Sequence, residues 1–517
     1  MGVLVLSLAI LWILRFPALH WGFYWDVAWV YGPAIFEMIE KGPSLLPGSI
    51  NPFLHTGHPL FFYFLESLWG RLFGSQVFSL QLFALLISSA LFTFVLYLVK
   101  QLFKHSLLTL FMAILLFQPV FLAQSTFVLP EMLLALLSLA SIWYFSKQNY
   151  WLYFLFAGLL VLTKESGLAI VAGISAAAFF RAQSSSVLYR FKEGIQYFLA
   201  ILPFVGFIFI QKIQLGWYFF PRHFNWISFD VREILNKSYD TAHFIMIDQQ
   251  RLYVFIGLIL LSHLLCYFFP GNNQWKKGAK VALIMLDTVL LYAFFAPSFK
   301  WQAATLPLFL LRSFVLFHYN RHMFSKKQSD FVLALLFCSL SFFIFCILNF
   351  MSLRYLGTLL LLLLFMHVAS ILQLVYAKKW PYLLSLFLLA NQILAYRTSW
   401  QSDTFFDVEL SYGRMIKVLS EMVEITNKQL DPDKDILLTH GQFKEALTRP
   451  KIGYQKKGTH LAPEKVLINS REAADYMVIS TYEHHPILDS LAALPSSNLI
   501  HEVRDGAAYS QLYKLHQ

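Results

Sequence analysis

Ionisable side chains stand at four places in this chain where an apolar segment begins or ends. The most isolated is Asp26, a single carboxylate that closes the aromatic stretch Phe23–Asp26 just beyond the first apolar segment. An acid in such a place is costly unless it has a partner or a chemical role. A carboxylate could act there as a general base, and neighbouring cations could stabilise a developing negative charge. The candidate residues are Asp26, His55, His58, Glu131, Lys164, Glu165, Arg354 and Tyr355.

Each candidate also has a purely structural interpretation. Glu131 follows Pro130 at an expected helix start, where an acid meets the positive end of the helix dipole. The pair Lys164–Glu165 could be self-neutralising in a tight turn, and Arg354–Tyr355 could anchor a helix at the membrane interface. The two histidines could be ordinary loop residues. The functional interpretation is favoured because two acids and several cations are all predicted on one side of a membrane.

Composition places the chain among the integral membrane proteins. Of its 517 residues, 58% are hydrophobic, 18% aromatic and only 13% charged, and the mean hydropathy is +0.59. A soluble protein carries about 25% charged residues. The formal net charge of +11 fits lysines and arginines in short cytoplasmic loops, so we expect no nucleic acid partner. The expected fold class is an all-α polytopic protein of the cell inner (plasma) membrane.

About thirteen apolar segments can be recognised, and most are long enough to span a bilayer as a tilted helix. No internal repeat relates them to one another. They lie near Val3–Leu14, Gln76–Val99, Leu107–Ala123, Leu129–Phe145, Trp151–Thr163, Gly167–Phe180, Ile195–Ile210, Leu252–Phe269, Val281–Ala296, Ala303–Phe317, Phe331–Phe350, Leu356–Val375 and Pro381–Tyr396.

The charge of the connecting loops predicts the topology. Basic residues gather in alternate loops, which the positive-inside rule places in the cytoplasm. The N-terminus would then be cytoplasmic, while loops 15–75 and 212–250 and the C-terminal region would face outward. A cleaved signal peptide is the alternative for the first segment, but Arg15-Phe16-Pro17 is a poor cleavage site. The basic residues are Lys100, Lys104, Lys147, Arg181, Arg190, Lys192, Lys276, Lys277, Lys280, Arg321, Lys326, Lys327, Lys378 and Lys379.

Beyond about residue 396 the composition changes, and this change predicts two domains. Residues 1–396 would form the transmembrane domain, and residues 397–517 a small α/β extracytoplasmic domain. In the latter, Ser411–Leu430 has the apolar face of an amphipathic helix, and two short apolar runs, Asp435–Leu438 and Tyr476–Ser480, suit buried strands. Two further runs, 499–503 and 507–512, flank an Asp-Gly turn and predict a hairpin. The three cysteines, Cys266, Cys338 and Cys346, lie in hydrophobic segments, so no disulfide framework is expected outside.

The order and sidedness of the short motifs resemble the GT-C superfamily of polyprenyl-phosphate-dependent glycosyltransferases. The bacterial branch related to protein O-mannosyltransferases, aminoarabinose–lipid A transferases and lipopolysaccharide-core galacturonosyltransferases is the most similar. The resemblance covers roughly residues 1–396. It consists, in chain order, of an acid after the first helix (Asp26), a Pro-Leu-aromatic run (Pro59–Tyr63), a Leu-Phe-Gly sequence (Leu72–Gly74), an acid at a later helix start (Glu131), a Thr-Lys-Glu-Ser-Gly stretch (Thr163–Gly167) and a late Arg-Tyr pair (Arg354–Tyr355).

This resemblance implies an enzyme that moves a sugar from a polyprenyl-phosphate donor to a lipid, glycan or protein acceptor on the outer side, with inversion expected. Asp26 would be the general base, and Glu131 would orient the acceptor or a cation. Arg354, Lys164 or a protonated histidine would stabilise the departing phosphate. A divalent cation is left open, because no metal-ligand spacing demands one. The sugar and the acceptor also stay open.

Two departures from the family pattern bear on those open points. Val27 follows Asp26 where many relatives have a second acid, and Gly57-His58 stands where relatives often have a Lys-Pro pair. A polytopic transporter or lipid flippase is the main alternative, and it should carry charge near the middle of its spans. Asp287 is the clearest acid deep in a predicted span. An assembly or sensor protein, which would act through its C-terminal domain, is a further alternative.

Overall fold

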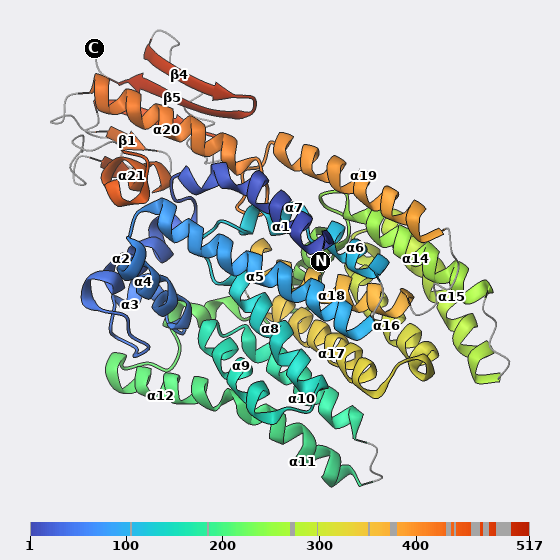
Figure 1. Cartoon of the computed structure of the whole chain (residues 1–517). Helices are drawn as coiled ribbons and strands as arrows, with labels where there is room; N and C mark the ends of the chain where they lie inside the picture. Colours follow the sequence, from blue (N-terminus) through green and yellow to red (C-terminus); the bar gives the residue numbers. More distant parts are fainter. Residues whose placement is uncertain are drawn as a thin grey trace.

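The computed structural model describes residues 2–103, 106–182, 186–268, 274–296, 298–349, 352–372, 380–430, 436–438, 441–455, 466–468, 475–481 and 498–515. Within them, helices occupy all the apolar segments predicted to span the membrane (Figure 1). The prediction of an all-α polytopic membrane protein is therefore confirmed. In these residues, several shorter apolar helices accompany five helical stretches that are long and apolar enough to cross a bilayer by length and composition. The five are Gly2–His20, Val77–Phe103, Val187–Leu215, Gly278–Phe295 and Lys326–Leu348.

The helices of the hydrophobic body lie at one end of the molecule and the C-terminal strands at the other (Figure 1). The basic loop residues Lys104, Lys378 and Lys379 fall outside the described residues, and the orientation of the chain in the membrane stays a prediction. The body consists of α1 (Gly2–Arg15), α5 (Val77–Phe103), α6 (Ser106–Leu115), α7 (Pro119–Gln124), α8 (Glu131–Ser146), α9 (Tyr150–Thr163), α10 (Gly167–Arg181), α11 (Val187–Phe198), η3 (Leu199–Ile201), α12 (Leu202–Leu215), α14 (Arg251–Phe268), α15 (Gln274–Phe295), α16 (Phe299–Asn320), η5 (Arg321–Met323), α17 (Lys326–Leu348), α18 (Leu356–Leu372) and α19 (Trp380–Gln401).

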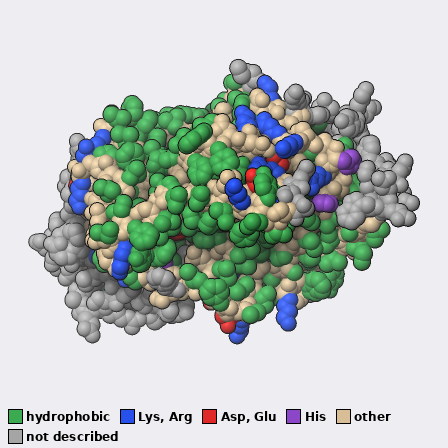
Figure 2. All heavy atoms as spheres, turned by 90° about the horizontal axis from the view of Figure 1, so that it is seen from below, with side chains coloured by type: hydrophobic (Ala, Val, Ile, Leu, Met, Phe, Trp, Pro, Cys, Tyr) green, Lys and Arg blue, Asp and Glu red, His purple; other side chains and the backbone are tan. Residues whose placement is uncertain are grey.

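The surface of the body is apolar, as a lipid-facing surface must be. Figure 2 shows one face on which hydrophobic side chains cover most of the area and charged side chains gather in a few places. On α11 and α12 the exposed side chains include Leu188, Ile195, Leu202, Phe209 and Ile213. Their backbone groups are paired within the helices, which is the condition for exposure to hydrocarbon.

One predicted span, Leu107–Ala123, is divided into two short helices, α6 and α7. The cause is Pro119, which has no N–H to donate and disfavours helical backbone at the residue before it. Gln118 accordingly has a ψ of 138°, and α7 begins at Pro119. The segment therefore bends just before the chain reaches the outer surface near Glu131.

The body is packed closely enough to need glycine at a helix contact. α10 packs against α17, and a Cβ atom added to Gly173 would lie 2.5 Å from the Cα of Cys338. Small residues that let helix backbones approach are typical of membrane helices, because packing replaces the hydrophobic effect there. α17 in turn packs against α18. Arg354 lies immediately before the first turn of α18.

Asp287, the acid predicted deep in a span, is neutralised within the body. Its Oδ1 accepts a hydrogen bond from Nε of Arg312 on the neighbouring helix α16. Both side chains are buried. This ion pair joins α15 to α16. Because it accounts for the buried charge of Asp287, that charge gives no support to the transporter interpretation.

The two loops predicted to face outward are built largely from short helices. The first contains η1 (Phe16–His20), η2 (Val27–Tyr31), α2 (Gly32–Lys41), α3 (Pro52–His55) and α4 (Phe61–Phe73), and the second contains η4 (Pro221–Trp226) and α13 (Val231–Met246).

Within α4, Glu66 is fully buried, and neither carboxyl oxygen has a hydrogen-bond partner in the described chain. Burial raises the pKa of Glu66 well above its usual 4.5. The folded state therefore requires the protonated acid.

We expect the stability of the protein to fall as the pH rises above about 4.5, because the unfolded state then releases a proton that folded Glu66 retains. The loss should approach about 1.4 kcal/mol per pH unit until the pKa of the folded state is reached. Glu66→Gln removes the titrating group and keeps its shape. Melting temperatures of both proteins between pH 5 and pH 8 should thus converge at low pH and diverge by several degrees at high pH. Equal slopes for the two proteins would contradict this.

The C-terminal strands form a mixed five-stranded sheet in the order β2-β1-β3-β5-β4. β1 pairs in parallel with β2 and β3, whereas β5 pairs antiparallel with β3 and β4. The predicted strands and the hairpin are confirmed, and α20 packs on β4 and β5 through the predicted face, in which Met415, Ile416, Leu419, Met422 and Val423 are buried. Asp435 lies outside the described residues. The elements are α20 (Tyr412–Gln429), β1 (Ile436–Leu438), α21 (Gly441–Thr448), η7 (Pro450–Ile452), β2 (Val466–Ile468), β3 (Tyr476–Ser480), β4 (Leu499–Asp505) and β5 (Ala508–Lys514).

Candidate functional site

Asp26 follows a turn of unusual backbone conformation. Trp25 has a φ of 54°, in the left-handed region that costs a residue with a Cβ atom about 1–2 kcal/mol. Its N–H donates to Oε1 of Gln442 at 2.9 Å, and Nε2 of Gln442 donates to the carbonyl of Phe23 at 3.0 Å. Residues 27–31 then form a π-helix, an irregularity often found at functional sites. The C-terminal helix α21 therefore holds the turn that presents Asp26.

Arg354 is the centre of a buried charge cluster. It lies in η6 (Leu353–Tyr355), just before α18, and only 4% of it is exposed. Its Nη2 donates to Oδ2 of Asp26, Nη1 donates to Oδ2 of Asp407 at 2.9 Å, and Nε donates to Oε1 of Glu131 at 3.3 Å. Three carboxylates from distant parts of the sequence thus share one guanidinium group.

Lys164 extends this cluster away from Asp26. Its Nζ donates to the same Oε1 of Glu131 at 2.8 Å and lies 3.6 Å from the centre of the Tyr355 ring. Lys164 and Glu131 are 1% and 3% exposed. The cation–π contact and the ion pair offset the cost of burying the ammonium group. Lys164 pairs with Glu131 in the structure, and the self-neutralising turn with its neighbour Glu165 does not form.

Glu165 instead pairs with His58. The distance from Nδ1 of His58 to Oε2 of Glu165 is 2.8 Å. Burial opposes ionisation of Glu165, but the charge and hydrogen bond of His58 lower its pKa to about 2. The turn before His58 needs glycine, because Gly57 has a φ of 77° and a Cβ atom there would lie 3.0 Å from the Trp217 ring. His55 lies behind this turn, fully buried, with a pKa lowered to about 4 by burial.

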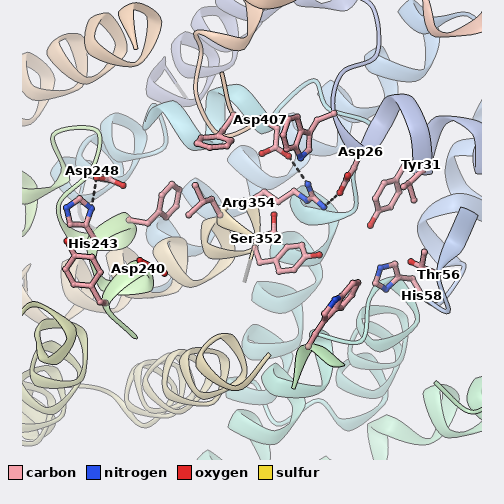
Figure 3. A pocket seen from close by; sticks show the side chains of 18 residues that line it. Asp26, Tyr31, Thr56, His58, Asp240, His243, Asp248, Ser352, Arg354 and Asp407 are labelled. Carbon is pink, nitrogen blue, oxygen red and sulfur yellow. Dashed lines mark hydrogen bonds and ion pairs between the residues drawn. The ribbon is translucent and has the colours of Figure 1, made fainter. Parts of the chain in front are cut away.

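A cavity of about 740 Å³ opens beside the cluster, a volume typical of ligand pockets. Of the residues predicted from the sequence, Asp26, His58, Arg354 and Tyr355 line it, while the other four lie behind its wall in the described structure. Figure 3 shows Arg354 between Asp26 and Asp407, with Ser352 beside it and Tyr31, Thr56 and His58 to one side. The lining residues are Trp25, Asp26, Val30, Tyr31, Thr56, His58, Trp226, Tyr239, Asp240, His243, Phe244, Asp248, Ser352, Leu353, Arg354, Tyr355, Phe406 and Asp407.

The electrostatics of the cluster distinguish its two cavity-lining acids. Burial favours the neutral form of Asp26, but the charge and hydrogen bond of Arg354 outweigh it and hold the pKa of Asp26 below its usual value. Burial raises the pKa of Asp407 despite the same arginine. Asp26 also accepts a hydrogen bond from Nε1 of Trp29 at 2.9 Å, which favours the ionised form. Of these two acids, Asp26 is therefore the one whose ionised form the surroundings favour.

Asp407 is the main site residue that the sequence interpretation missed. It lies between α19 and α20, in a segment held by side chains of the body: Nε2 of Gln124 donates to the carbonyl of Asp407 at 2.7 Å, and Oη of Tyr24 donates to the carbonyl of Phe405 at 2.6 Å. A signal was present, because an aromatic stretch ending in a single acid occurs here just as it does at Asp26. Asp240, His243 and Asp248, on and after α13, were also missed.

The three carboxylates serve as partners of cations in this structure. In the part of the chain that the structure describes, no group of three or more His, Cys, Asp or Glu side chains is arranged to hold a metal ion. Divalent-cation binding at this site stays open.

Comparison with known proteins gives similarity of structure alone. No family model matches the chain, and no curated protein matches it significantly. Among solved structures it is similar to ArnT from Cupriavidus metallidurans, in the apo state and bound to undecaprenyl phosphate, each with 13% identity, a TM-score of 0.43, and coverage of 99% of this chain and 98% of that one. It is also similar to the archaeal oligosaccharyltransferase AglB from Archaeoglobus fulgidus in complex with an inhibitory peptide and a dolichol-phosphate, with 14% identity, a TM-score of 0.42, and coverage of 89% and 64%.

Because all three TM-scores are below 0.5, we base the functional proposal on the contacts within this chain.

Proposed function

We propose that this protein is a membrane glycosyltransferase that moves a sugar from a polyprenyl-phosphate-linked donor to an acceptor on the extracytoplasmic side. The proposal is carried by one observation: the buried guanidinium group of Arg354 meets the wall of a cavity of about 740 Å³ beside Asp26. The order of motifs that contribute Asp26, Glu131, Lys164 and Arg354 resembles that of polyprenyl-phosphate-dependent enzymes.

Arg354 has the chemistry of a phosphate-binding group. A guanidinium group offers donors in a planar fork that matches phosphate oxygens. Three carboxylates now accept hydrogen bonds from those donors. An incoming phosphate would replace Asp26 and Asp407, which line the cavity. Glu131, which does not line it, would keep its hydrogen bond from Nε of Arg354. Lys164 would add a second positive charge near the phosphate without touching it.

The reaction then requires one bond to form and one to break at the sugar. The acceptor hydroxyl oxygen attacks the anomeric carbon, the bond from that carbon to the phosphate oxygen breaks, and polyprenyl phosphate leaves. The hydroxyl proton passes to Asp26, and the negative charge that develops on the phosphate is stabilised by Arg354.

Donor binding would also make Asp26 a better base. In the present structure Arg354 holds the pKa of Asp26 low, and a carboxylate with a low pKa accepts protons poorly. When the phosphate takes the guanidinium group, Asp26 loses its nearest positive charge and its pKa rises toward the ordinary range. The base is thus activated only when donor is bound.

We expect purified protein in liposomes to transfer sugar from a polyprenyl-phosphate-linked donor and not from a nucleotide sugar. No glycine-rich strand-to-helix motif for a nucleotide is present in the sequence, and the cavity is lined by the outer loops. The assay supplies a cell-envelope lipid extract as the source of acceptor. It measures the glycosylated acceptor and the free polyprenyl phosphate that form. Robust transfer from a nucleotide sugar without any lipid carrier would overturn the proposal.

A further inference from the structure

The cavity has a second end, formed mainly by α13. Figure 3 shows Asp240, His243 and Asp248 together on the side of Arg354 opposite to Tyr31, Thr56 and His58. α13 is positioned by packing against α16, with Ser238, Thr241, Ala242 and Ile245 on its buried face.

The side chains at this end are arranged differently from those at Arg354. Nδ1 of His243 lies 2.9 Å from Oδ1 of Asp248, and this hydrogen bond raises the pKa of His243, so the two form a self-neutralising pair. Asp240 is exposed and makes no hydrogen bond or ion pair to any residue that the structure describes. Its carboxylate is therefore free to accept hydrogen bonds from a ligand.

Aromatic rings surround these polar groups. Tyr239 lies 5.5 Å from the His243 ring and 4.6 Å from the Phe299 ring, measured between centroids. Phe244, Trp226 and Phe406 also line the cavity. Aromatic faces pack against the C–H face of a sugar ring, and carboxylates accept hydrogen bonds from its hydroxyl groups. A mostly apolar wall with a few polar groups of this kind is the usual composition of a ligand pocket.

Charge divides the two ends. Among the cavity-lining residues that the structure describes, Arg354 is the only arginine or lysine. A phosphate that displaces Asp26 and Asp407 from Arg354 finds its partner at that end, whereas a second anionic group near Asp240 would be repelled.

Building on the proposed function, we propose that the α13 end of the cavity is a carbohydrate subsite that accepts a sugar ring without negative charge, with Asp240 as the residue that binds its hydroxyl groups. The sugar can be that of the donor or one belonging to the acceptor. Both sources share the same recognition chemistry, and binding measurements separate them.

The test uses the full chain in nanodiscs and compares the parent with Asp240→Asn. One arm measures binding of undecaprenyl phosphate, undecaprenyl-phosphate-glucose and undecaprenyl-phosphate-glucuronate. The other arm measures binding to an array of neutral and uronate-containing glycans with undecaprenyl phosphate present. Asp230→Asn is the matched control, because Asp230 caps the start of the same helix outside the cavity, and asparagine is an equally good cap.

We expect the parent to bind a neutral sugar more tightly than its uronate counterpart, and Asp240→Asn to weaken that binding about tenfold, as expected for loss of a charged hydrogen-bond partner. Bare undecaprenyl phosphate should bind both proteins within twofold, and Asp230→Asn should match the parent. If Asp240→Asn loses affinity only for undecaprenyl-phosphate-glucose, the subsite binds the sugar of the donor. If it loses affinity for glycans on the array, the subsite binds a sugar of the acceptor.

Tighter binding of uronates, or sugar binding that is equal in the parent and in Asp240→Asn, would overturn the subsite. A parent that binds no undecaprenyl phosphate would instead refute the proposed function.

Discussion

Asp26→Asn is expected to lower the rate of sugar transfer by about two to four orders of magnitude, the usual contribution of a general base. The amide keeps the shape of the side chain but has no basic oxygen. Binding of polyprenyl phosphate should persist or become tighter, because the variant no longer competes as an anion for Arg354. The measurement is single-turnover transfer, made together with polyprenyl phosphate affinity and Tm on the same purified protein.

Glu131→Gln is the matched control for this experiment. Glu131 is another carboxylate on the same guanidinium group, but it is buried and does not line the cavity. Loss of the Glu131 charge should weaken the ion pairs with Arg354 and Lys164. It should slow sugar transfer less than Asp26→Asn does. If the two variants lose equal activity, Asp26 acts only as a partner of Arg354. A folded Asp26→Asn protein with near-parental transfer would show that the base lies elsewhere.

Arg354→Lys should weaken donor binding by about one to two orders of magnitude. Lysine keeps the positive charge but replaces a planar fork with a single ammonium group, which cannot grip two phosphate oxygens and also reach Glu131. Removing the charge altogether would leave three carboxylates without their shared partner, at a cost of about 3–5 kcal/mol, so lysine is the more informative substitution. The measurement is the affinity for polyprenyl phosphate.

Arg71→Lys provides the control for that substitution. Arg71 lies in α4, in the loop of residues 15–75, and donates to the carbonyl of Ile39 at 2.7 Å. It does not line the cavity, so its replacement should leave donor affinity unchanged. If Arg354 only anchors its helix at the membrane interface, Arg354→Lys should bind donor and turn over as the parent does. That result would remove the phosphate-binding role from the proposed mechanism.

Much of the candidate site was predictable because its residues stand out against an apolar background. Charged groups are costly where membrane helices begin or end, so Asp26, Glu131, Lys164 and Arg354 are conspicuous in the sequence, and the structure brings all four together. Their detailed partners were not predictable. Lys164 turns to Glu131, while its neighbour Glu165 turns to His58, because adjacent residues in a turn can point in different directions.

Asp407 illustrates why the rest required the fold. In the sequence it is one acid among many in the polar region after residue 396, and its role depends on a loop that folds back over the body. Asp240 likewise lies on an ordinary amphipathic helix, and its relevance comes from the cavity that α13 shares with Arg354. Such juxtapositions join residues that are far apart in the chain, and no local pattern encodes them.

The sequence by itself determined that the apolar segments are helical and that the chain is a membrane protein, because hydrocarbon admits only apolar segments whose backbone groups are paired within helices. It also determined strands β1, β3, β4 and β5 and the buried face of α20, since short apolar runs, an Asp-Gly turn and the helical period mark them. Strand β2 (Val466–Ile468) was not predicted. The tertiary structure alone decided that three carboxylates share Arg354 and that one cavity joins this cluster to α13. Those features depend on how helices pack, and packing is set by the simultaneous fit of many side chains.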